Sequence, residues 1–170
     1  MKYLLLLILM MGRFPGFAQI RSADLRAAGL TCAMCSNAIN KSLKTLRFVQ
    51  KVDVDLNHSS FLIFFREGEE IDIDAVRRKV EDAGFSVASL TITADLPEIQ
   101  LSGEGIVQIG NQFLCLLNYK GQVVKARQTF RIIERGYLSD KEYKKYQHPS
   151  RSWNQCESKK DSGIVHVVVL

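Results

Sequence analysis

The order of strand-like and helix-like segments in residues 22–93 constrains this chain more than any other feature. Apolar residues recur at helical spacing in residues 34–46 and again in residues 75–83, and Gly84 marks the end of the second helix. Segments typical of strands precede, separate and follow these two helices: 24–29, 48–56, 61–66 and 85–93. The order β-α-β-β-α-β predicts an α+β sandwich of four strands and two helices.

This order also predicts where the loops lie. In an antiparallel sheet of this kind, the first strand, the second strand and the second helix all run toward the same end. The loop after the first strand, the turn at residues 57–60 and the Gly84-Phe85 loop should therefore share that end. The chemically reactive side chains of residues 22–93 are expected to gather there.

Cys32 and Cys35 form a CxxC motif between the first strand and the first helix. Two intervening residues let both sulfurs converge on one point, and the N-terminus of the helix stabilises negative charge on them. Two thiolates with no further evident ligand favour a soft ion of low coordination number, and among physiological metals this is Cu(I). Structural zinc needs four ligands, and no second CxxC lies nearby. The motif predicts one Cu(I) ion on Cys32 and Cys35, with Hg(II) or another soft metal as the alternative.

Two other interpretations of this motif stay open. The cysteines could form a structural disulfide, or they could act as a thioredoxin-like redox pair. Against the redox pair, no tryptophan precedes the motif, the element order is wrong for that fold, and neither Pro97 nor Pro149 has the position of a loop cis-proline. We therefore expect no enzyme, and an extracytoplasmic thiol-disulfide oxidoreductase is the rival function.

Three segments resemble one known family. Gly-Leu-Thr-Cys-Ala-Met-Cys at 29–35, Val-Asp-Val-Asp-Leu at 52–56 and Glu-Asp-Ala-Gly-Phe at 81–85 are similar to the heavy-metal-associated domain. This is the fold of copper chaperones, of the N-terminal modules of copper-transporting P-type ATPases and of the periplasmic mercury-binding protein. The resemblance covers residues 24–93 and implies a ferredoxin-like βαββαβ fold with Cys32 and Cys35 as metal ligands. It also implies a metal-transport protein or another metallochaperone as partner. Leu30 stands where the family usually has methionine, and we expect it to pack beneath the loop.

The first 18 residues predict an export signal. Lys2 is followed by an unbroken apolar run at residues 4–11, and Gly16 and Ala18 are small residues suited to cleavage after Ala18. The run is far shorter than the roughly 20 residues that cross a bilayer, so we expect no stable membrane insertion. An uncleaved anchor is the alternative. The expected product is a periplasmic or secreted protein whose mature chain begins near Gln19.

The net charge of +5 is spread along the chain rather than gathered in one segment. Residues 22–93 carry nine basic and ten acidic side chains, and residues 94–170 carry eleven and eight. No segment has the concentrated basic face that nucleic-acid binding needs. We therefore expect no nucleic-acid partner.

Residues 94–98 predict a linker, because Pro97 holds its predecessor extended. Several short apolar segments separated by glycine turns then predict a β-rich domain at 99–170, with an OB-like barrel as the suggested form and no assigned role. One helix is expected at 140–146, where Ser139 and Glu142 form a capping box. The domains at 22–93 and 99–170 are expected to fold as separate units.

The other two cysteines stand alone in the sequence. Cys115 lies in an apolar strand and Cys156 in a polar loop, so a disulfide between them would remove an exposed thiol outside the cell. The alternative is a second thiol site that exchanges metal with the first. His58 belongs to the same end as the CxxC motif but is expected to be a surface residue, and His148 and His166 have no neighbour at metal-ligand spacing.

Overall fold

The computed structural model describes residues 18–30, 32–96, 99–100, 105–121, 123–124, 126–147, 153, 156 and 163–170. Of the expected signal peptide at 1–18, only Ala18 lies within these ranges. Among the described residues, no helix has both the length and the apolar character to cross a membrane.

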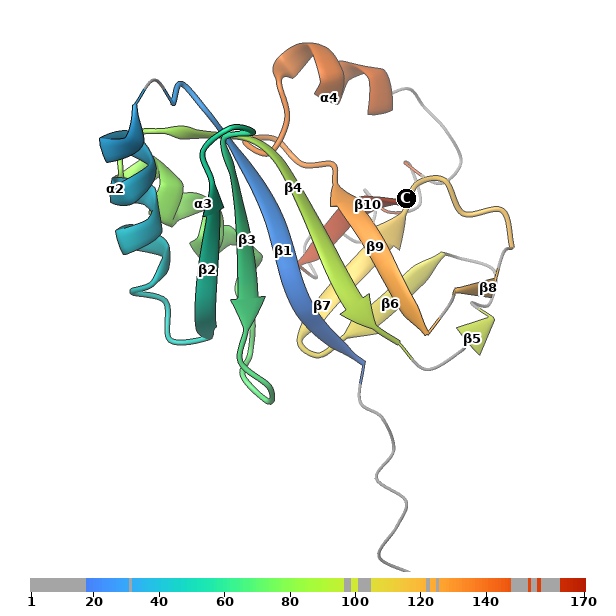
Figure 1. The fold of residues 1–170 in the computed structure, drawn as a ribbon. Helices are drawn as coiled ribbons and strands as arrows, with labels where there is room; N and C mark the ends of the chain where they lie inside the picture. The colour runs from blue at the N-terminus through green and yellow to red at the C-terminus, as the bar shows by residue number, and fades with distance from the viewer. Residues whose placement is uncertain are drawn as a thin grey trace, which may run out of the picture.

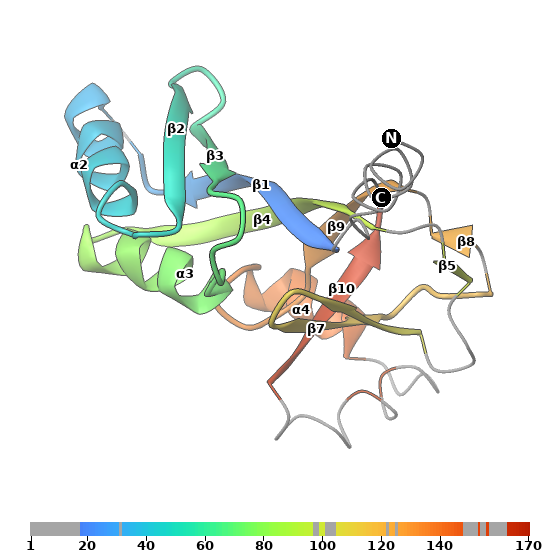
Figure 2. The same cartoon turned by 90° about the horizontal axis from the view of Figure 1, so that it is seen from below.

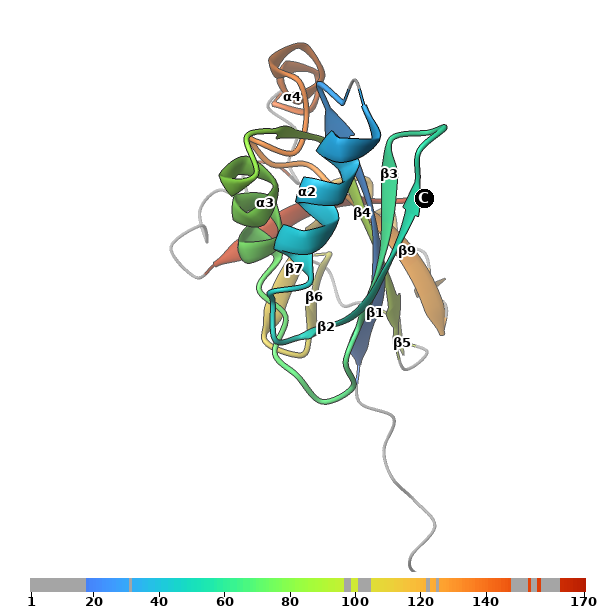
Figure 3. The same cartoon turned by 60° about the vertical axis from the view of Figure 1, so that its left-hand side comes forward.

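The first half of the chain has the predicted element order (Figure 1). Its elements are β1 (Gln19–Ala28), α2 (Ala33–Leu43), β2 (Val49–Asp55), β3 (Ser60–Phe65), α3 (Ile73–Asp82) and β4 (Ser86–Asp95). The helices α2 and α3 lie side by side over one face of the four strands (Figure 3). The first strand begins earlier than expected, at Gln19. The ferredoxin-like α+β fold predicted for this half is confirmed.

Three loops meet at one end of this sheet, as the element order predicted. Ala28 at the end of β1 is paired with Ser86 at the start of β4. The Ala27 N–H donates to the Ser59 carbonyl over 3.2 Å, which brings the β2–β3 turn beside the same point. The loops that follow β1, β2 and α3 are therefore neighbours.

The second half adds strands to the same sheet instead of forming a separate barrel (Figure 2). Its elements are β5 (Ile99–Gln100), β6 (Ile106–Ile109), β7 (Gln112–Leu116), β8 (Val123–Val124), β9 (Arg127–Ile132), α4 (Asp140–Tyr146) and β10 (Ile164–Val169). The eight-stranded sheet has the order β2-β3-β1-β4-β9-β10-β7-β6, and β5 and β8 form a small sheet of their own. The prediction of an OB-like barrel is not confirmed: β9 pairs with the edge of β4.

The expected linker at 94–98 is largely part of this sheet. Ala94 and Asp95 are the last residues of β4, where they pair with Gln128 and Arg127 of β9, and Leu96 is buried. Pro97 and Glu98 lie outside the described residues. The period-two alternation Ile92, Ala94, Leu96 continues the buried face of β4, and this pattern outweighs the proline signal.

One apolar core extends across both halves. It contains Leu25, Ile63 and Val80 from the first half together with Phe130 and Val167 from the second, all fully buried. A shared sheet and a shared core mean that the two halves are packed as one body. The separate folding of residues 22–93 and 99–170 stays a prediction.

Candidate metal centre

The CxxC motif lies where β1 gives way to α2. Gly29 has a φ of +80°, a left-handed conformation that glycine adopts without strain, and it turns the chain out of the strand. Cys32 follows as the N-cap residue of α2, with an extended backbone at φ −155° and ψ 158°. Cys35 lies in the first turn of the helix. Thr31 is outside the described residues.

The two sulfurs converge at the start of the helix, as the spacing predicted. The Sγ atoms of Cys32 and Cys35 lie 2.7 Å apart. The Cys35 N–H donates to the Cys32 Sγ over 3.3 Å, and the helix has no acidic residue in its first turn. A backbone donor and the positive end of the helix dipole therefore stabilise negative charge on Cys32, with no carboxylate in that turn to oppose them.

Packing beneath the motif holds its geometry. The side chains of Ser36, Ile39 and Leu43 on α2 are buried, so this face of the helix is fixed against the sheet. Leu30 and Phe85 are half-buried against the same core, as was expected of Leu30. The sulfurs thus lie on a rigid base, with Cys32 exposed and Cys35 half-buried.

Met34 and His58 are the other candidate ligand side chains considered at this end. Met34 is 82% exposed on α2. The His58 Nδ1 lies 2.7 Å from the Asp55 Oδ2, and this hydrogen bond lowers the pKa of Asp55. Within the described ranges, no group of three or more His, Cys, Asp and Glu side chains is arranged to hold a metal ion. The two cysteines are therefore the candidate ligands at this end.

The predicted disulfide between Cys115 and Cys156 is confirmed. Both residues are fully buried, their Cα atoms are 6.1 Å apart, and the bridge spans 41 positions in the sequence. The alternative, a second thiol site for metal, is therefore wrong, because these sulfurs are bonded to each other.

His166 has a setting that the sequence did not reveal. It is buried in β10, its Nδ1 lies 2.6 Å from the Glu134 Oε1, and its ring stacks on Trp153 with centroids 4.6 Å apart. The partners lie 32 and 13 positions away, so spacing alone carries no signal of the cluster. His148 is outside the described residues.

A comparison with known families agrees with the motif and the fold. Residues 24–86 match the heavy-metal-associated domain, and this segment is a little over a third of the chain. Residues 24–86 form a heavy-metal-associated domain. The match ends at Ser86, the first residue of β4, and β9, β10, β7 and β6 form an extension that lies outside it.

Curated relatives align with the heavy-metal-associated domain alone. A probable copper-exporting P-type ATPase of Archaeoglobus fulgidus is 37% identical over 62 residues, which cover 36% of this chain and 8% of the ATPase. A copper-transporting ATPase of Saccharomyces cerevisiae is 32% identical over 66 residues, covering 39% of this chain and 6% of the ATPase. The chain thus matches under a tenth of the length of these relatives.

Among solved structures, the yeast copper transporter domain Ccc2a, determined in solution in the apo and Cu(I) states, is 31% identical. The superposition covers 39% of this chain and 90% of that domain, with a TM-score of 0.36.

Proposed function

We propose that this protein is a carrier of one soft metal ion, Cu(I), which it holds between the thiolates of Cys32 and Cys35. The observation that carries the proposal is the convergence of both sulfurs, 2.7 Å apart, at the exposed N-terminus of α2. The copper-transporting relatives of its heavy-metal-associated domain support the same metal. Hg(II) is the runner-up, since it also suits two thiolates.

The ligand set argues for a soft ion over a hard or four-coordinate one. Thiolates select Cu(I), whereas a structural zinc ion requires four ligands. In the described part of the chain, no third or fourth ligand side chain accompanies the cysteine pair. Mg²⁺ and Ca²⁺ prefer oxygen ligands, which this end of the sheet does not bring to the sulfurs.

The unequal exposure of the two cysteines suggests an order of transfer. Cys32 is exposed and Cys35 is half-buried, so a thiolate of a partner protein reaches the ion from the side of Cys32. The incoming thiolate binds the ion while Cys35 still holds it, and Cys32 is released. The ion moves without being set free and without a change in its oxidation state. A metal-transport ATPase or another metallochaperone is the proposed partner, and the protein acts as a carrier and not as an enzyme.

We further propose that residues 1–18 direct export and are then removed, so that the carrier works in the periplasm or outside the cell. β1 begins at Gln19, the first residue after the proposed cleavage point, so cleavage would leave the first strand whole. The buried disulfide between Cys115 and Cys156 fits an oxidising compartment. Mass spectrometry of the protein recovered from separated cell fractions tests this: a mature chain beginning at Gln19 is expected, and an intact Met1 in the cytoplasm would refute export.

The metal proposal is tested by stoichiometry in the reduced, oxygen-free protein. One Cu(I) per chain is expected, held against a colorimetric Cu(I) chelator, and Cys32→Ser and Cys35→Ser should each abolish this binding. His58→Ala, at the same end of the sheet, is the matched control and should bind as the native chain does. Full-affinity binding of Cu(I) after either cysteine substitution would contradict the two-thiolate site. Tighter binding of Hg(II) than of Cu(I) in cells exposed to both would favour the runner-up.

The rival function, a thiol-disulfide oxidoreductase, predicts turnover. The same reduced protein should show no catalytic reduction of insulin disulfides beyond that of the Cys32→Ser variant. Turnover that depends on Cys32 would reverse the ranking of the two functions.

A further inference from the structure

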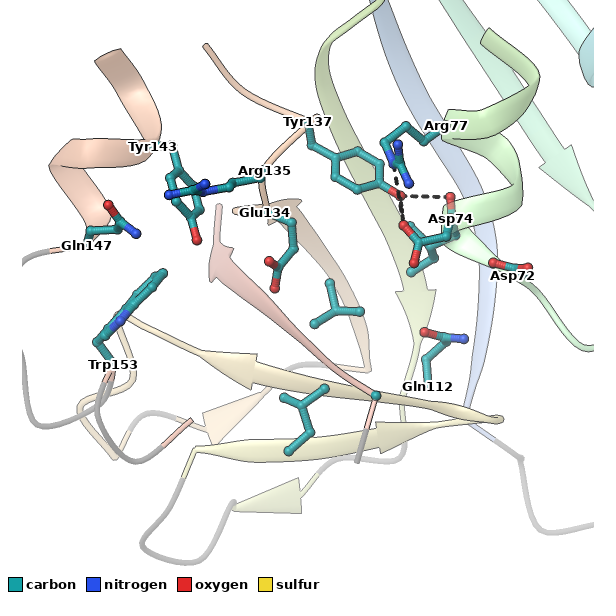
Figure 4. A pocket seen from close by; sticks show the side chains of 14 residues that line it. Asp72, Asp74, Arg77, Gln112, Glu134, Arg135, Tyr137, Tyr143, Gln147 and Trp153 are labelled. Atoms are coloured by element: carbon teal, nitrogen blue, oxygen red, sulfur yellow. Dashed lines mark hydrogen bonds and ion pairs between the residues drawn. The ribbon is translucent and has the colours of Figure 1, made fainter. Parts of the chain in front are cut away.

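A second candidate site lies at the junction between the heavy-metal-associated domain and the extension (Figure 4). It is a cavity of about 680 Å³ bounded by the start of α3, the loop that follows β9, the helix α4 and the first residues of β10. The CxxC motif is not part of it. Cavities at the junction of two structural units are frequent ligand sites.

One wall of the cavity is the first part of β10, which no described residue pairs with on the β9 side. β9 pairs with β10 over residues 167–169, and beyond Ile133 the chain turns away into the loop at 134–138. His166 directs its carbonyl to the Ile133 N–H, over 2.8 Å, and its own N–H to the Glu134 Oε1, over 2.9 Å. The Glu134 carboxylate thus replaces the backbone carbonyl that a longer β9 would have supplied.

The same alternation places a backbone donor and acceptor in the cavity. The Val167 carbonyl points the other way, toward the Leu117 N–H at the end of β7. Successive residues of a strand direct their backbone groups to opposite sides, so Ile164 faces the same side as His166. Ile164 lines the cavity, and no described residue takes the place of β9 beside it. A peptide strand laid there would continue the sheet.

The lining of the cavity includes aliphatic side chains and an excess of acidic over basic residues. Ile73, Ile164 and Val165 are among the apolar lining residues. The Glu134 carboxylate points into the space in Figure 4. The charged lining residues are three acids and two bases: Asp72, Asp74, Glu134, Arg77 and Arg135.

Both bases are already engaged. The Arg77 guanidinium donates to both carboxylate oxygens of Glu81, at 2.7 and 2.8 Å, and the Arg135 guanidinium lies 5.5 Å from the centroid of the Tyr143 ring. Asp72 and Asp74 also have partners, but no described residue donates a hydrogen bond to the Glu134 Oε2. With three carboxylates against two guanidinium groups, the lining as a whole favours a cationic group over an anionic one.

We propose that this cavity binds an extended peptide segment that carries an arginine or lysine side chain. The peptide backbone pairs with Ile164 at the open edge of β10, in the manner of strand addition, and the basic side chain lies against Glu134. Small apolar side chains flank the basic residue, because the lining also contains Ile73 and Ile164. This site is separate from the metal centre, and its occupancy does not depend on the proposed metal.

Trp153 provides the readout, because it lines the cavity and is the single tryptophan of the protein. The titrant is acetyl-Val-Arg-Val-amide, added to the full-length oxidised protein. A saturable change of the tryptophan fluorescence is expected, with affinity at least about tenfold higher than that for acetyl-Val-Glu-Val-amide. The absence of a saturable change up to about 10 mM, or equal responses to the two peptides, would overturn the proposal.

Two modified probes test the strand pairing without altering the protein. N-methylation removes one backbone donor, so methylating the amide of either the arginine or the following valine should weaken binding about tenfold in at least one case. If neither methylated peptide binds more weakly, the backbone pairing is wrong. Acetyl-arginine-amide should bind at least about tenfold more weakly than the tripeptide, and equal affinity would indicate a site for small cations instead.

Substitutions in the protein complete the test. Glu134→Gln keeps an oxygen acceptor for the His166 N–H and removes the charge, so the preference for the arginine over the glutamate peptide should fall by at least about fivefold. Asp53→Asn, the same change of charge on β2 at the far edge of the sheet, should leave the preference unaltered. Where Glu134→Gln does not fold, the preference of the native chain for the arginine over the glutamate peptide is the test of the charge. An unaltered preference in a folded Glu134→Gln variant would contradict the proposed contact.

Discussion

Cys32 has two roles at the start of α2. As the N-cap residue, its sulfur accepts the Cys35 N–H, a task that serine or aspartate performs in most helices. As a thiolate, it is a proposed metal ligand. Serine can fulfil the first role and is a poor ligand for a soft ion, so Cys32→Ser separates the two. A loss of copper binding in this variant would therefore report on the ligand and not on the helix.

Tyr137 is the residue that ties the extension to the heavy-metal-associated domain. Its side chain is buried, and its hydroxyl lies 3.0 Å from both the Ile73 carbonyl and the Asp74 Oδ1 at the first turn of α3. Burial, together with the Asp74 charge, raises the pKa of Tyr137 well above its usual value. The hydroxyl thus stays a neutral donor across the range in which the protein is folded.

Tyr137→Phe should lower the free energy of unfolding by about 1–2 kcal/mol, because the ring remains packed while the buried carbonyl loses its donor. Urea denaturation measures the difference. Tyr146→Phe on α4 is the control and should change the free energy by less than about 0.5 kcal/mol. A Tyr137→Phe variant as stable as the control would show that this hydrogen bond does not hold the two halves together.

At the scale of elements, the sequence predicted where strands and helices lie better than it predicted which strands pair with each other. The bounds of α4 agree with those expected, and the CxxC motif lies between β1 and α2 as its context indicated. The sequence did not predict that β9 pairs with the edge of β4. An alternating segment such as 127–132 has the same pattern whether it pairs within a barrel or with another domain. Strand pairing depends on contacts between distant residues, which no local signal encodes.

The two cysteine pairs also show that local spacing predicts contacts better than long-range pairing. The close spacing of Cys32 and Cys35 was enough to predict that their sulfurs meet. The pairing of Cys115 with Cys156 followed from the compartment and from the count of cysteines, not from geometry. The cluster of Glu134, Trp153 and His166 combines residues from three separate segments, so it could be found only in the structure.

The Cys115–Cys156 disulfide should be a major source of stability for the extension. Its loss releases a loop of 41 positions, which corresponds to roughly 3–4 kcal/mol of chain entropy in the unfolded state. Denaturation of the Cys115→Ala/Cys156→Ala variant measures this, with Cys32→Ser/Cys35→Ser as the control of equal cysteine count. After metal removal without reductant, two reactive thiols per chain are expected. Four would show that the bridge is not formed.

An ion-pair cluster crosses three strands at the end of the sheet opposite the metal centre. Asp95 on β4 accepts hydrogen bonds from Arg127 on β9, at 2.8 Å, and from Arg21 on β1, at 2.7 Å. These contacts, with Arg127 the larger contribution, hold the pKa of Asp95 below its usual value. The ion pairs join the extension to the first strand of the metal domain.

A carboxyl group with a depressed pKa in the folded state stabilises the fold above its unfolded pKa and loses that contribution as the pH falls through the folded value. The stability provided by Asp95 should therefore be complete at neutral pH and decline below about pH 4. The free energy of unfolding of Asp95→Asn should be lower than that of the native chain at pH 7, and the two should converge at acidic pH. Parallel curves from pH 7 to pH 3 would refute this linkage.

At the scale of the whole molecule, the extension changes what the heavy-metal-associated domain exposes. Residues 91–95 of β4 are paired with residues 127–131 of β9, so an edge that the domain would leave open is covered. The opposite edge is β2, where Lys51, Asp53 and Asp55 place charges along the strand. Charged edge residues oppose pairing with another chain. The metal centre lies away from this junction, among the loops that β1, β3 and β4 hold together.

A fragment of residues 19–96 should therefore fold and bind one Cu(I), but with a lower melting temperature and a tendency to self-associate. It retains both helices and all four strands around the metal centre, and it loses Phe130, Ile132 and Tyr137 from the shared core. It also exposes the edge of β4. Light scattering after size exclusion should show association that increases with concentration, whereas Thr91→Lys/Thr93→Lys should restore the monomer by placing charges along that edge. A monomeric fragment with the same melting temperature as the full-length chain would show that β9 adds no stability. An unfolded fragment would show that the heavy-metal-associated domain depends on the extension.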